Sequence, residues 1–334
     1  MINCYDYKVK INIMFAGYIK IPESSSKWVL TKKEKKLMDS TKWVVTEKVH
    51  GSCFAFVYDK NGSVKYAKRK EILSAGDDFF GYKQMLPGVI PKILKIVAYL
   101  KEKIKAWDQI IIYGELFGGI PPVQSGIFYS SDLHFYAFDI SKISNGSEMY
   151  LDYGESILAF EHSEILYARP LFTGSFESAI AYKMGFQTTL PKILGITDII
   201  ENNKAEGIVI KPLKEILINS RDRMILKIKI PEFSEVKYNQ SEKPKVKVGF
   251  NYFGYFRDEE IDNFLTENRM NNAVSKLGSR YRVSELCELL YHDVLSEFEE
   301  NDLWRELESE ERVEIKNILK KRIEGFVNKT LGKN

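Results

Sequence analysis

Cysteine is scarce in this chain: there are three among 334 residues, and they lie far apart in the sequence. An odd, widely spaced set favours neither a disulfide framework nor a cysteine-ligated zinc site. Long apolar runs are also lacking, because none approaches the roughly 20 residues needed to span a bilayer, and no signal-peptide pattern opens the chain. We therefore expect a protein of a reducing, cytoplasmic compartment without membrane attachment.

A strong excess of either charge is lacking as well, since the formal net charge is only +3. Its distribution is uneven: acidic residues outnumber basic ones in residues 250–334, so the positive excess belongs to residues 1–249. An electropositive surface favours a polyanionic partner, because neutralised phosphates release their counterions. A solvated lysine-rich surface explains the same charge equally well.

The pattern of elements changes near residue 243. Short segments rich in β-branched and aromatic residues, with helical candidates between them, predict an α+β domain over residues 1–243. Its residues 1–13 could be a dispensable extension. Residues 242–249 are typical of a linker, and apolar residues at three- and four-residue spacing predict a helical domain over residues 244–334. The predicted strands are 43–46, 53–58, 63–67, 110–113, 134–140, 207–210 and 224–230, and the predicted helices are 91–107, 153–166 and 175–182.

A lysine close to a glycine is the first sign of covalent chemistry. Lys48 follows a predicted strand, and Gly51 stands three residues later. An amine nucleophile must lose its proton to react, and glycine lets the backbone come close to a nucleotide. The pattern is weak by itself, because lysine-x-x-glycine occurs by chance in many proteins.

Four further segments follow in order. Tyr113–Gly118 holds a carboxylate beside glycines, and Phe135–Ile140 is an aromatic strand with one acid. Glu206 stands before an apolar strand. Lys227 and Lys229 are two residues apart, so both lie on one face of a predicted strand. Two like charges on one face repel each other unless an anion lies between them.

In this order and spacing, the segments resemble the motifs of covalent nucleotidyltransferases, which include DNA ligases, RNA ligases and mRNA capping enzymes. They look most like the RNA ligase 2 family, which contains phage double-strand RNA ligases and the RNA-editing ligases of trypanosomes. The details that carry this resemblance are His50 before the motif glycine, Ala67–Arg69, Phe79–Tyr82 and Phe233–Glu235. The resemblance extends over residues 43–235.

The resemblance implies the chemistry. Lys48 would attack the α-phosphorus of ATP and form lysyl-AMP, with Mg²⁺ or Mn²⁺ shielding the leaving pyrophosphate. Glu206 is the implied metal contact. Phe138 would stack on adenine, and Arg69 and Glu115 would contact the ribose. The implied catalytic residues are Lys48, His50, Asp139, Lys227 and Lys229; the implied nucleotide-binding residues are Glu47, Arg69, Glu115, Phe138, Glu206, Lys227 and Lys229.

One position departs from the family pattern, and one group of residues in the helical domain extends the resemblance. Cys53 stands where the family usually has asparagine, and a thiol cannot replace the hydrogen bonds of an amide. This affects the expected efficiency or step selectivity, and an exposed thiol would add sensitivity to oxidation. In the helical domain, Asp293 and Glu297 lie four residues apart and, with Arg269, resemble residues that engage RNA. Surface charge also explains these three.

We thus expect an α+β protein in which two antiparallel sheets form a nucleotidyltransferase domain, followed by a helical C-terminal domain. The implied activity is an ATP-dependent RNA ligase that seals 3′-OH and 5′-phosphate ends, at nicks in duplex RNA or at bridged ends, and we expect a monomer. A DNA ligase or capping enzyme would normally carry a β-barrel domain after Lys229, and a DNA ligase an aspartate at position 50. A catalytically inactive RNA-binding relative is the alternative from another class.

Overall fold

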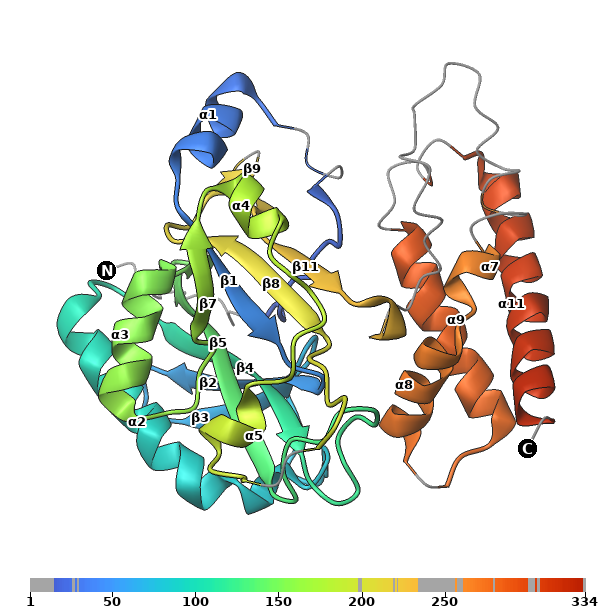
Figure 1. Ribbon diagram of the computed structural model, residues 1–334, viewed down its shortest axis with the longest axis horizontal. Helices are drawn as coiled ribbons and strands as arrows, with labels where there is room; N and C mark the ends of the chain where they lie inside the picture. The colour runs from blue at the N-terminus through green and yellow to red at the C-terminus, as the bar shows by residue number, and fades with distance from the viewer. Residues whose placement is uncertain are drawn as a thin grey trace, which may run out of the picture. The chain divides into compact units, whose positions relative to one another are not determined.

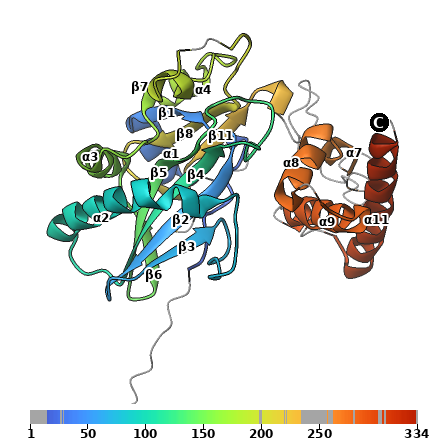
Figure 2. The ribbon, with the colours of Figure 1, turned by 90° about the horizontal axis from the view of Figure 1, so that it is seen from below.

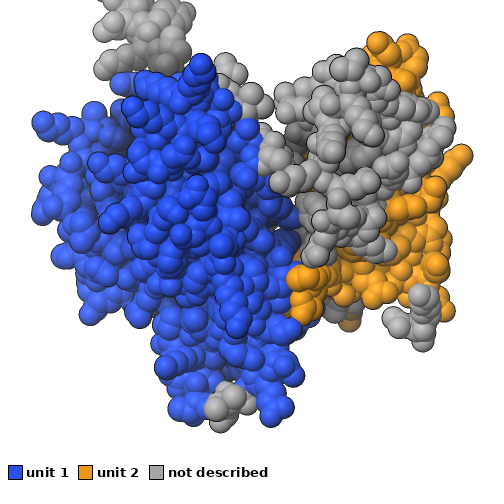
Figure 3. Space-filling model, turned by 45° about the horizontal axis from the view of Figure 1, so that its top comes forward, with its two compact units in different colours: residues 1–230 blue, residues 231–334 orange. Residues whose placement is uncertain are grey.

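The chain forms two compact units, Met1–Ile230 and Pro231–Asn334, which are coloured separately in Figure 3. The predicted linker at residues 242–249 and the predicted boundary at residue 243 lie outside the described residues. The computed structural model describes residues 15–233, 256 and 261–332, apart from gaps at 26–27, 29, 198–199, 219, 221, 279, 300–303 and 305–306.

The first unit contains an antiparallel sheet, here called sheet A, with the strand order β11-β8-β1-β7. Successive side chains point to opposite faces. One face is apolar: Trp43 and Ile208 pack there against Met38 and Ala179, which come from two helices. The other face carries lysines. The elements are α1 (Lys32–Ser40), β1 (Trp43–Lys48), β7 (Pro170–Gly174), α4 (Phe176–Ile180), β8 (Gly207–Pro212) and β11 (Leu226–Lys229).

A second antiparallel sheet, here called sheet B, has the order β3-β2-β4-β5-β6. Helices α2 and α3 lie side by side on one of its faces (Figures 1 and 2), over a core that includes Phe56 and Phe135. The segment Phe79–Tyr82 packs on this same core. The elements are β2 (Ser52–Asp59), β3 (Val64–Lys68), α2 (Leu86–Lys103), β4 (Gln109–Gly118), β5 (Leu133–Ser144), β6 (Ser147–Tyr150) and α3 (Tyr153–Ser163).

A β-bulge interrupts the pairing of β4 with β5. Tyr113 lies opposite Asp139, whereas Gly114 lies opposite Ala137, so Phe138 is an extra residue on its strand. A bulge of this kind bends the strand and re-aims side chains, and bulges are frequent beside active sites.

The second unit is helical. Leu286, Leu290, Val294 and Phe298 form the buried stripe of α9, as their spacing predicts. Thr266 caps α8 by accepting a hydrogen bond from the backbone N–H of Arg269. No helix among the described residues combines the length and apolar character that crossing a membrane requires. The helices are α7 (Ile261–Phe264), α8 (Glu267–Leu277), α9 (Val283–Glu299) and α11 (Ser309–Leu331).

The predicted fold class, two antiparallel sheets with helices followed by a helical region, is confirmed. The helix predicted at residues 91–107 begins instead at Leu86 and ends at Lys103. Pro87 falls in its first turn, where a missing N–H costs no hydrogen bond, while Pro91 lies inside the helix. Strands β6 and β7 were not predicted, because four or five residues without clear alternation give little signal.

Candidate active site

One row of residues across sheet A brings the predicted nucleophile close to a second lysine. Lys48 at the end of β1 lies opposite Gly207 of β8, and Gly207 lies opposite Lys229 of β11. Residues directly opposite one another share a face of the sheet. A Cβ at Gly207 would lie 2.0 Å from the carbonyl oxygen of Ile228, so only glycine fits there. The row therefore carries two amines, with a residue that has no side chain between them.

Glu206, immediately before β8, joins this row. Its Oε2 accepts a hydrogen bond from Lys48 Nζ at 2.7 Å, and its Oε1 lies 3.4 Å from Lys229 Nζ. His50 Nδ1 lies 3.3 Å from Oε2. Burial alone would raise the pKa of Glu206, but the charges of Lys48 and Lys229 hold that pKa well below its usual range. An ionised carboxylate thus orients the two amines, while 19% of the Lys48 side chain remains exposed.

The turn that follows β1 packs closely against β4. The backbone N–H of His50 donates a hydrogen bond to the hydroxyl of buried Tyr129 at 2.8 Å. A Cβ on Gly51 would lie 2.0 Å from the carbonyl oxygen of Leu116, which explains the motif glycine. The backbone N–H of Gly51 also hydrogen-bonds the Glu115 carboxylate. Tyr129 was not predicted, since nothing near it in the sequence marks it as part of this turn.

Glu115 differs from Glu206 in its protonation. Burial raises the pKa of Glu115 to about 7; Lys48 acts against this rise and Glu206 adds to it. Two neighbouring carboxyl groups therefore have pKa values that are displaced in opposite directions. Lys227 also acts on Glu115, and its Nζ lies 3.5 Å from Glu23 Oε1.

Glu47 has its carboxylate in a separate environment from that of Lys48. It accepts hydrogen bonds from the hydroxyl of Thr188 and from both the N–H, at 2.9 Å, and the hydroxyl, at 2.6 Å, of Thr189. Burial raises the pKa of Glu47, and these hydrogen bonds lower it again. The side chain ties β1 to the segment before α5 (Leu190–Ile193). The implied role of Glu47 in nucleotide binding stays a prediction.

Three of the residues singled out from the sequence lie on or next to the face of sheet B that α2 and α3 leave uncovered: Cys53, Arg69 and Phe138. Phe138 and Cys53 are half-buried in one cluster on this face, and Arg69 follows β3. Glu115, Arg69 and Lys48 all act electrostatically on the Cys53 thiol, so this thiol lies near these charged groups. Burial raises the pKa of Cys53 far above its usual range, so the thiol stays protonated at neutral pH. A raised pKa leaves little of the reactive thiolate, which argues against the sensitivity to oxidation considered above.

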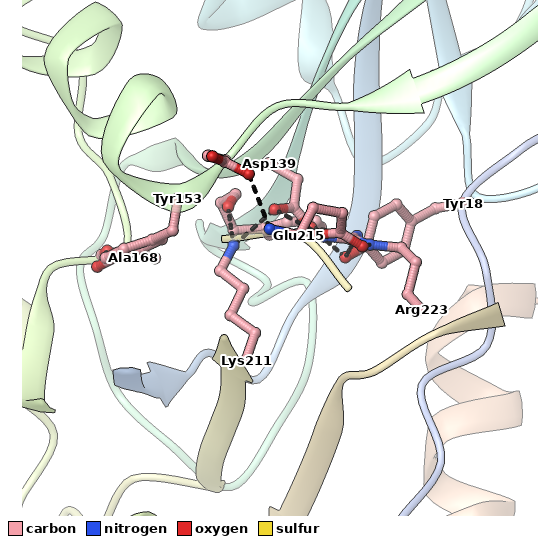
Figure 4. A network of polar contacts seen from close by, with 9 residues as sticks. Tyr18, Asp139, Tyr153, Ala168, Lys211, Glu215 and Arg223 are labelled. Carbon is pink, nitrogen blue, oxygen red and sulfur yellow. Dashed lines mark hydrogen bonds and ion pairs between the residues drawn. The ribbon is translucent and has the colours of Figure 1, made fainter. Parts of the chain in front are cut away.

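Among the described residues, Asp139 makes no hydrogen bond or ion pair with Lys48 or Glu206. It lies in a buried network with Lys211, Arg223 and Tyr18 (Figure 4). Burial would raise the pKa of Asp139, but Arg223 and Lys211 hold it well below the usual range. The contacts give no support to the implied catalytic role. The sequence contains no local signal for such a network, because its members come from four distant segments.

In the second unit, the three residues singled out from the sequence lie together. Arg269 of α8 is buried, and its guanidinium forms an ion pair with Asp293 and another, at 3.3 Å, with Glu297 Oε2. Asp293 and Glu297 are one turn apart on α9 and are 38% and 20% exposed. Both acids thus reach the surface of this unit.

The residues around Glu206 suit only one kind of metal site. Among the residues that the structure describes, no group of three or more His, Cys, Asp or Glu could hold a metal. Mg²⁺ often binds through one or two carboxylates together with substrate phosphates and water. Glu206, with Glu115 nearby, suits that kind of site rather than a cage made only of protein ligands.

Comparison with protein families gives two matches in sequence order. Residues 41–229 match the model described as RNA ligase, and residues 258–325 match the one described as T4 RNA ligase 2 C-terminal. The first match covers all the active-site strands described above. The second covers α8 and α9, with the Arg269 cluster.

Individual proteins are also similar. RNA-editing ligase 2, mitochondrial, of Trypanosoma brucei brucei is 29% identical, over 85% of this chain and 83% of that protein. RNA-editing ligase 1, mitochondrial, is 28% identical, over 85% and 75%. A mutant RNA ligase of Naegleria gruberi, solved with ATP and Mn, is 18% identical with a TM-score of 0.45. That match covers 64% of this chain and 56% of the solved one, so this chain spans less than two thirds of that ligase.

Proposed function

The chain belongs to the RNA ligase family, in the RNA ligase 2 branch, and on this basis we propose that it is an ATP-dependent enzyme that joins RNA ends. Lys48 takes AMP from ATP, AMP passes to the 5′-phosphate of an RNA end, and the 3′-OH then displaces AMP. The intermediates are lysyl-AMP and RNA-adenylate. Mg²⁺ or Mn²⁺, held by Glu206 and the phosphates, would shield the charge of the pyrophosphate that leaves.

One observation carries this proposal: Lys48 Nζ lies 2.7 Å from Glu206, whose other oxygen faces Lys229 at 3.4 Å. Phosphoryl transfer depends mainly on positioning and on charge neutralisation. Glu206 is held ionised, so it orients the Lys48 amine rather than accepting its proton at neutral pH. Lys229 supplies a positive charge in the same row of sheet A, where a phosphate that meets Lys48 gains a second cation.

The base and ribose of ATP are assigned to sheet B. Phe138 supports this assignment because it is half-buried in an otherwise buried stretch of strand. Stacking of a base on an aromatic ring contributes on the order of 1–3 kcal/mol. Glu115, with its pKa near neutrality, can exist with or without its proton at working pH, and either form can hydrogen-bond a ribose hydroxyl.

The proposed substrate is RNA with a nick in a duplex, or two ends bridged by a complementary strand. Recognition would depend on A-form shape, phosphates and 2′-OH groups. Asp293 and Glu297 would serve the engagement of RNA, with Arg269 holding both acids in place. We propose that the protein acts as a monomer.

Incubation with α-labelled ATP or GTP and magnesium, followed by denaturing electrophoresis, tests the first step. We expect label from ATP only, released by acid and absent in Lys48→Ala. The matched control is Lys142→Ala, which removes a half-buried strand lysine that belongs to neither site. Label from GTP would favour a capping activity, and no label from either nucleotide would favour an inactive RNA-binding relative.

A second assay compares the sealing of nicked RNA, nicked DNA and hybrid duplexes by the same preparation. We expect sealing to require RNA on the 3′-OH side of the nick, because recognition of 2′-OH groups distinguishes RNA from DNA. Equal sealing of all-DNA nicks would contradict the assignment of an RNA substrate. Sealing of unbridged single strands at the same rate would contradict the requirement for a duplex.

A further inference from the structure

The segment at residues 15–21 lies on the face of sheet B that α2 and α3 leave uncovered, where Tyr18 is buried. The backbone N–H of Tyr18 donates a hydrogen bond to the carbonyl oxygen of Arg69 at 2.7 Å. Gly17 precedes it with φ +86, and a Cβ there would lie 2.5 Å from the same oxygen. This close contact needs glycine and fixes the segment at the end of β3.

The side chain of Tyr18 contacts both residues at the bulge of β5. Its ring meets the Phe138 ring edge-on, with the centroids 5.1 Å apart. Its hydroxyl donates a hydrogen bond to the carboxylate of Asp139. Burial raises the pKa of Tyr18 well above its usual range, so the hydroxyl remains a donor. One tyrosine thus links Arg69, through its backbone, to Phe138 and Asp139, through its side chain.

Two buried cations, Lys211 and Arg223, also hold the bulge, and Arg223 lies beside Tyr18 (Figure 4). Lys211 Nζ, on β8 of sheet A, donates at 2.8 Å to the carbonyl oxygen of Phe138 and at 2.5 Å to Asp139. Arg223 donates to Asp139 at 2.8 Å and to Glu215 at 2.7 Å. The backbone of the bulge and the carboxylate are therefore fixed. The Phe138 ring depends on its neighbours in the cluster for its orientation.

We propose that Tyr18 is a positioning residue for adenine binding: it holds the Phe138 ring in the orientation that the base requires. This inference rests on the proposed function. Phe138 is the half-buried member of a run from Phe135 to Ser141 that is otherwise buried, so part of its ring is open to a ligand. A stacked base requires a defined ring plane, and the edge-on contact with Tyr18 supplies it.

Two substitutions separate the contacts of Tyr18. Tyr18→Phe removes the hydrogen bond that the hydroxyl donates to Asp139 and the one that it accepts from Arg223 at 3.2 Å. Tyr18→Leu also removes the ring contact with Phe138. For lysyl-AMP formation from labelled ATP, we expect the KM for ATP to rise about threefold in Tyr18→Phe and about tenfold in Tyr18→Leu. The rate at saturating ATP should change by less than about twofold, because Lys48 and Glu206 are untouched.

The matched control is Tyr167→Phe. Tyr167 is also buried, and its hydroxyl donates to a carboxylate, Glu161 Oε1, at 2.8 Å, but it belongs to the core under α2 and α3. We expect a loss of thermal stability similar to that in Tyr18→Phe, with an unchanged KM for ATP. A rise in KM of the same size in this control would show a general effect of stability and would overturn the inference.

A double-mutant cycle gives the sharper outcome. If Tyr18 acts through the ring, Tyr18→Leu should raise the KM for ATP in the native background and not in Phe138→Leu. An equal rise in both backgrounds, or no rise in folded Tyr18 variants, would contradict it. The Kd for ATP, measured by calorimetry on the same proteins, should follow the same pattern. If the unaltered protein forms no lysyl-AMP, the proposed function fails, and the Kd values still decide the role of Tyr18.

Discussion

Two buried carboxylates in the first unit, Glu206 and Asp139, each face two cations, yet their surroundings differ. Lys48, which pairs with Glu206, is 19% exposed, whereas Lys211 and Arg223, which pair with Asp139, are 5% and 2% exposed. The cations of Asp139 also bind a carbonyl oxygen and a second carboxylate. The Asp139 network is thus closed, and the Glu206 group keeps an accessible amine, as a group that reacts with a ligand must.

The largest expected effect is a difference between the two carboxylates in how much their removal lowers the free energy of unfolding. Asp139→Ala leaves Lys211 and Arg223 buried without a shared counter-charge, and breaking a buried pair in this way costs about 3–5 kcal/mol. We expect a loss of this size in the free energy of unfolding, measured by urea titration at neutral pH.

Glu206→Ala is the matched comparison for this measurement. Lys48 can turn toward water when its partner is removed, whereas Lys229, which is 5% exposed, stays buried. We therefore expect a loss smaller than that in Asp139→Ala, where both cations stay buried. Equal losses in the two variants would remove the distinction between a closed network and an open one. Lysyl-AMP formation should be lost in Glu206→Ala while the fold is kept.

The next effect concerns rate rather than stability. Lys229→Ala removes the cation that faces Glu206 from the side opposite Lys48, and loss of one such stabilising group typically lowers a rate by about 10²–10³. We expect a fall of this size in lysyl-AMP formation at saturating ATP, measured in single-turnover experiments. Lys142→Ala serves as the control, and a comparable fall in it would contradict a specific role of Lys229.

A smaller effect follows from the opposite displacements of the pKa values of Glu115 and Glu206. The pKa of Glu115 in the folded protein is about 7, against 4.5 in the unfolded chain, so the folded state binds more protons in this window. Its contribution to stability is present below pH 4.5 and is lost as the pH rises through 7. Glu206 has the reverse sign, since its lowered pKa stabilises the fold above its unfolded pKa and this contribution is lost as the pH falls.

Glu115→Gln should therefore flatten the fall in unfolding free energy between pH 5 and pH 8 by about 1–2 kcal/mol. Unfolding titrations at several pH values measure this slope in the protein and in the variant. Parallel curves would show that Glu115 does not titrate in this range. A steeper fall in the variant would contradict the sign of the displacement.

The sequence predicted the Glu206 group far better than the Asp139 network. Lys48, Glu206 and Lys229 stand in recognisable motifs, and strand register brings their segments into one row. Tyr18 and Arg223 stand in no such motif, and their contacts depend on the bulge at Phe138 and on chain packing over long sequence distances. A bulge adds one residue to a strand, and a sequence with no pairing information does not reveal it. The β-branched and aromatic composition of the strand segments and the apolar spacing in α9 indicated an α+β domain and a helical domain. The family resemblance implied the two antiparallel sheets.

The smallest expected effect concerns Cys53, on whose thiol Glu115 and Lys48 act electrostatically. Burial raises the pKa of its thiol, so almost none of it is the reactive thiolate at neutral pH. Iodoacetamide should modify Cys53 at least about 100-fold more slowly in the native protein than in denaturant, as measured site by site with mass spectrometry. Cys53→Ser, which keeps a small neutral side chain, should change the rate of lysyl-AMP formation by less than about threefold. Rapid modification of the native protein at Cys53, with loss of label from ATP, would instead make this thiol a reactive member of the site.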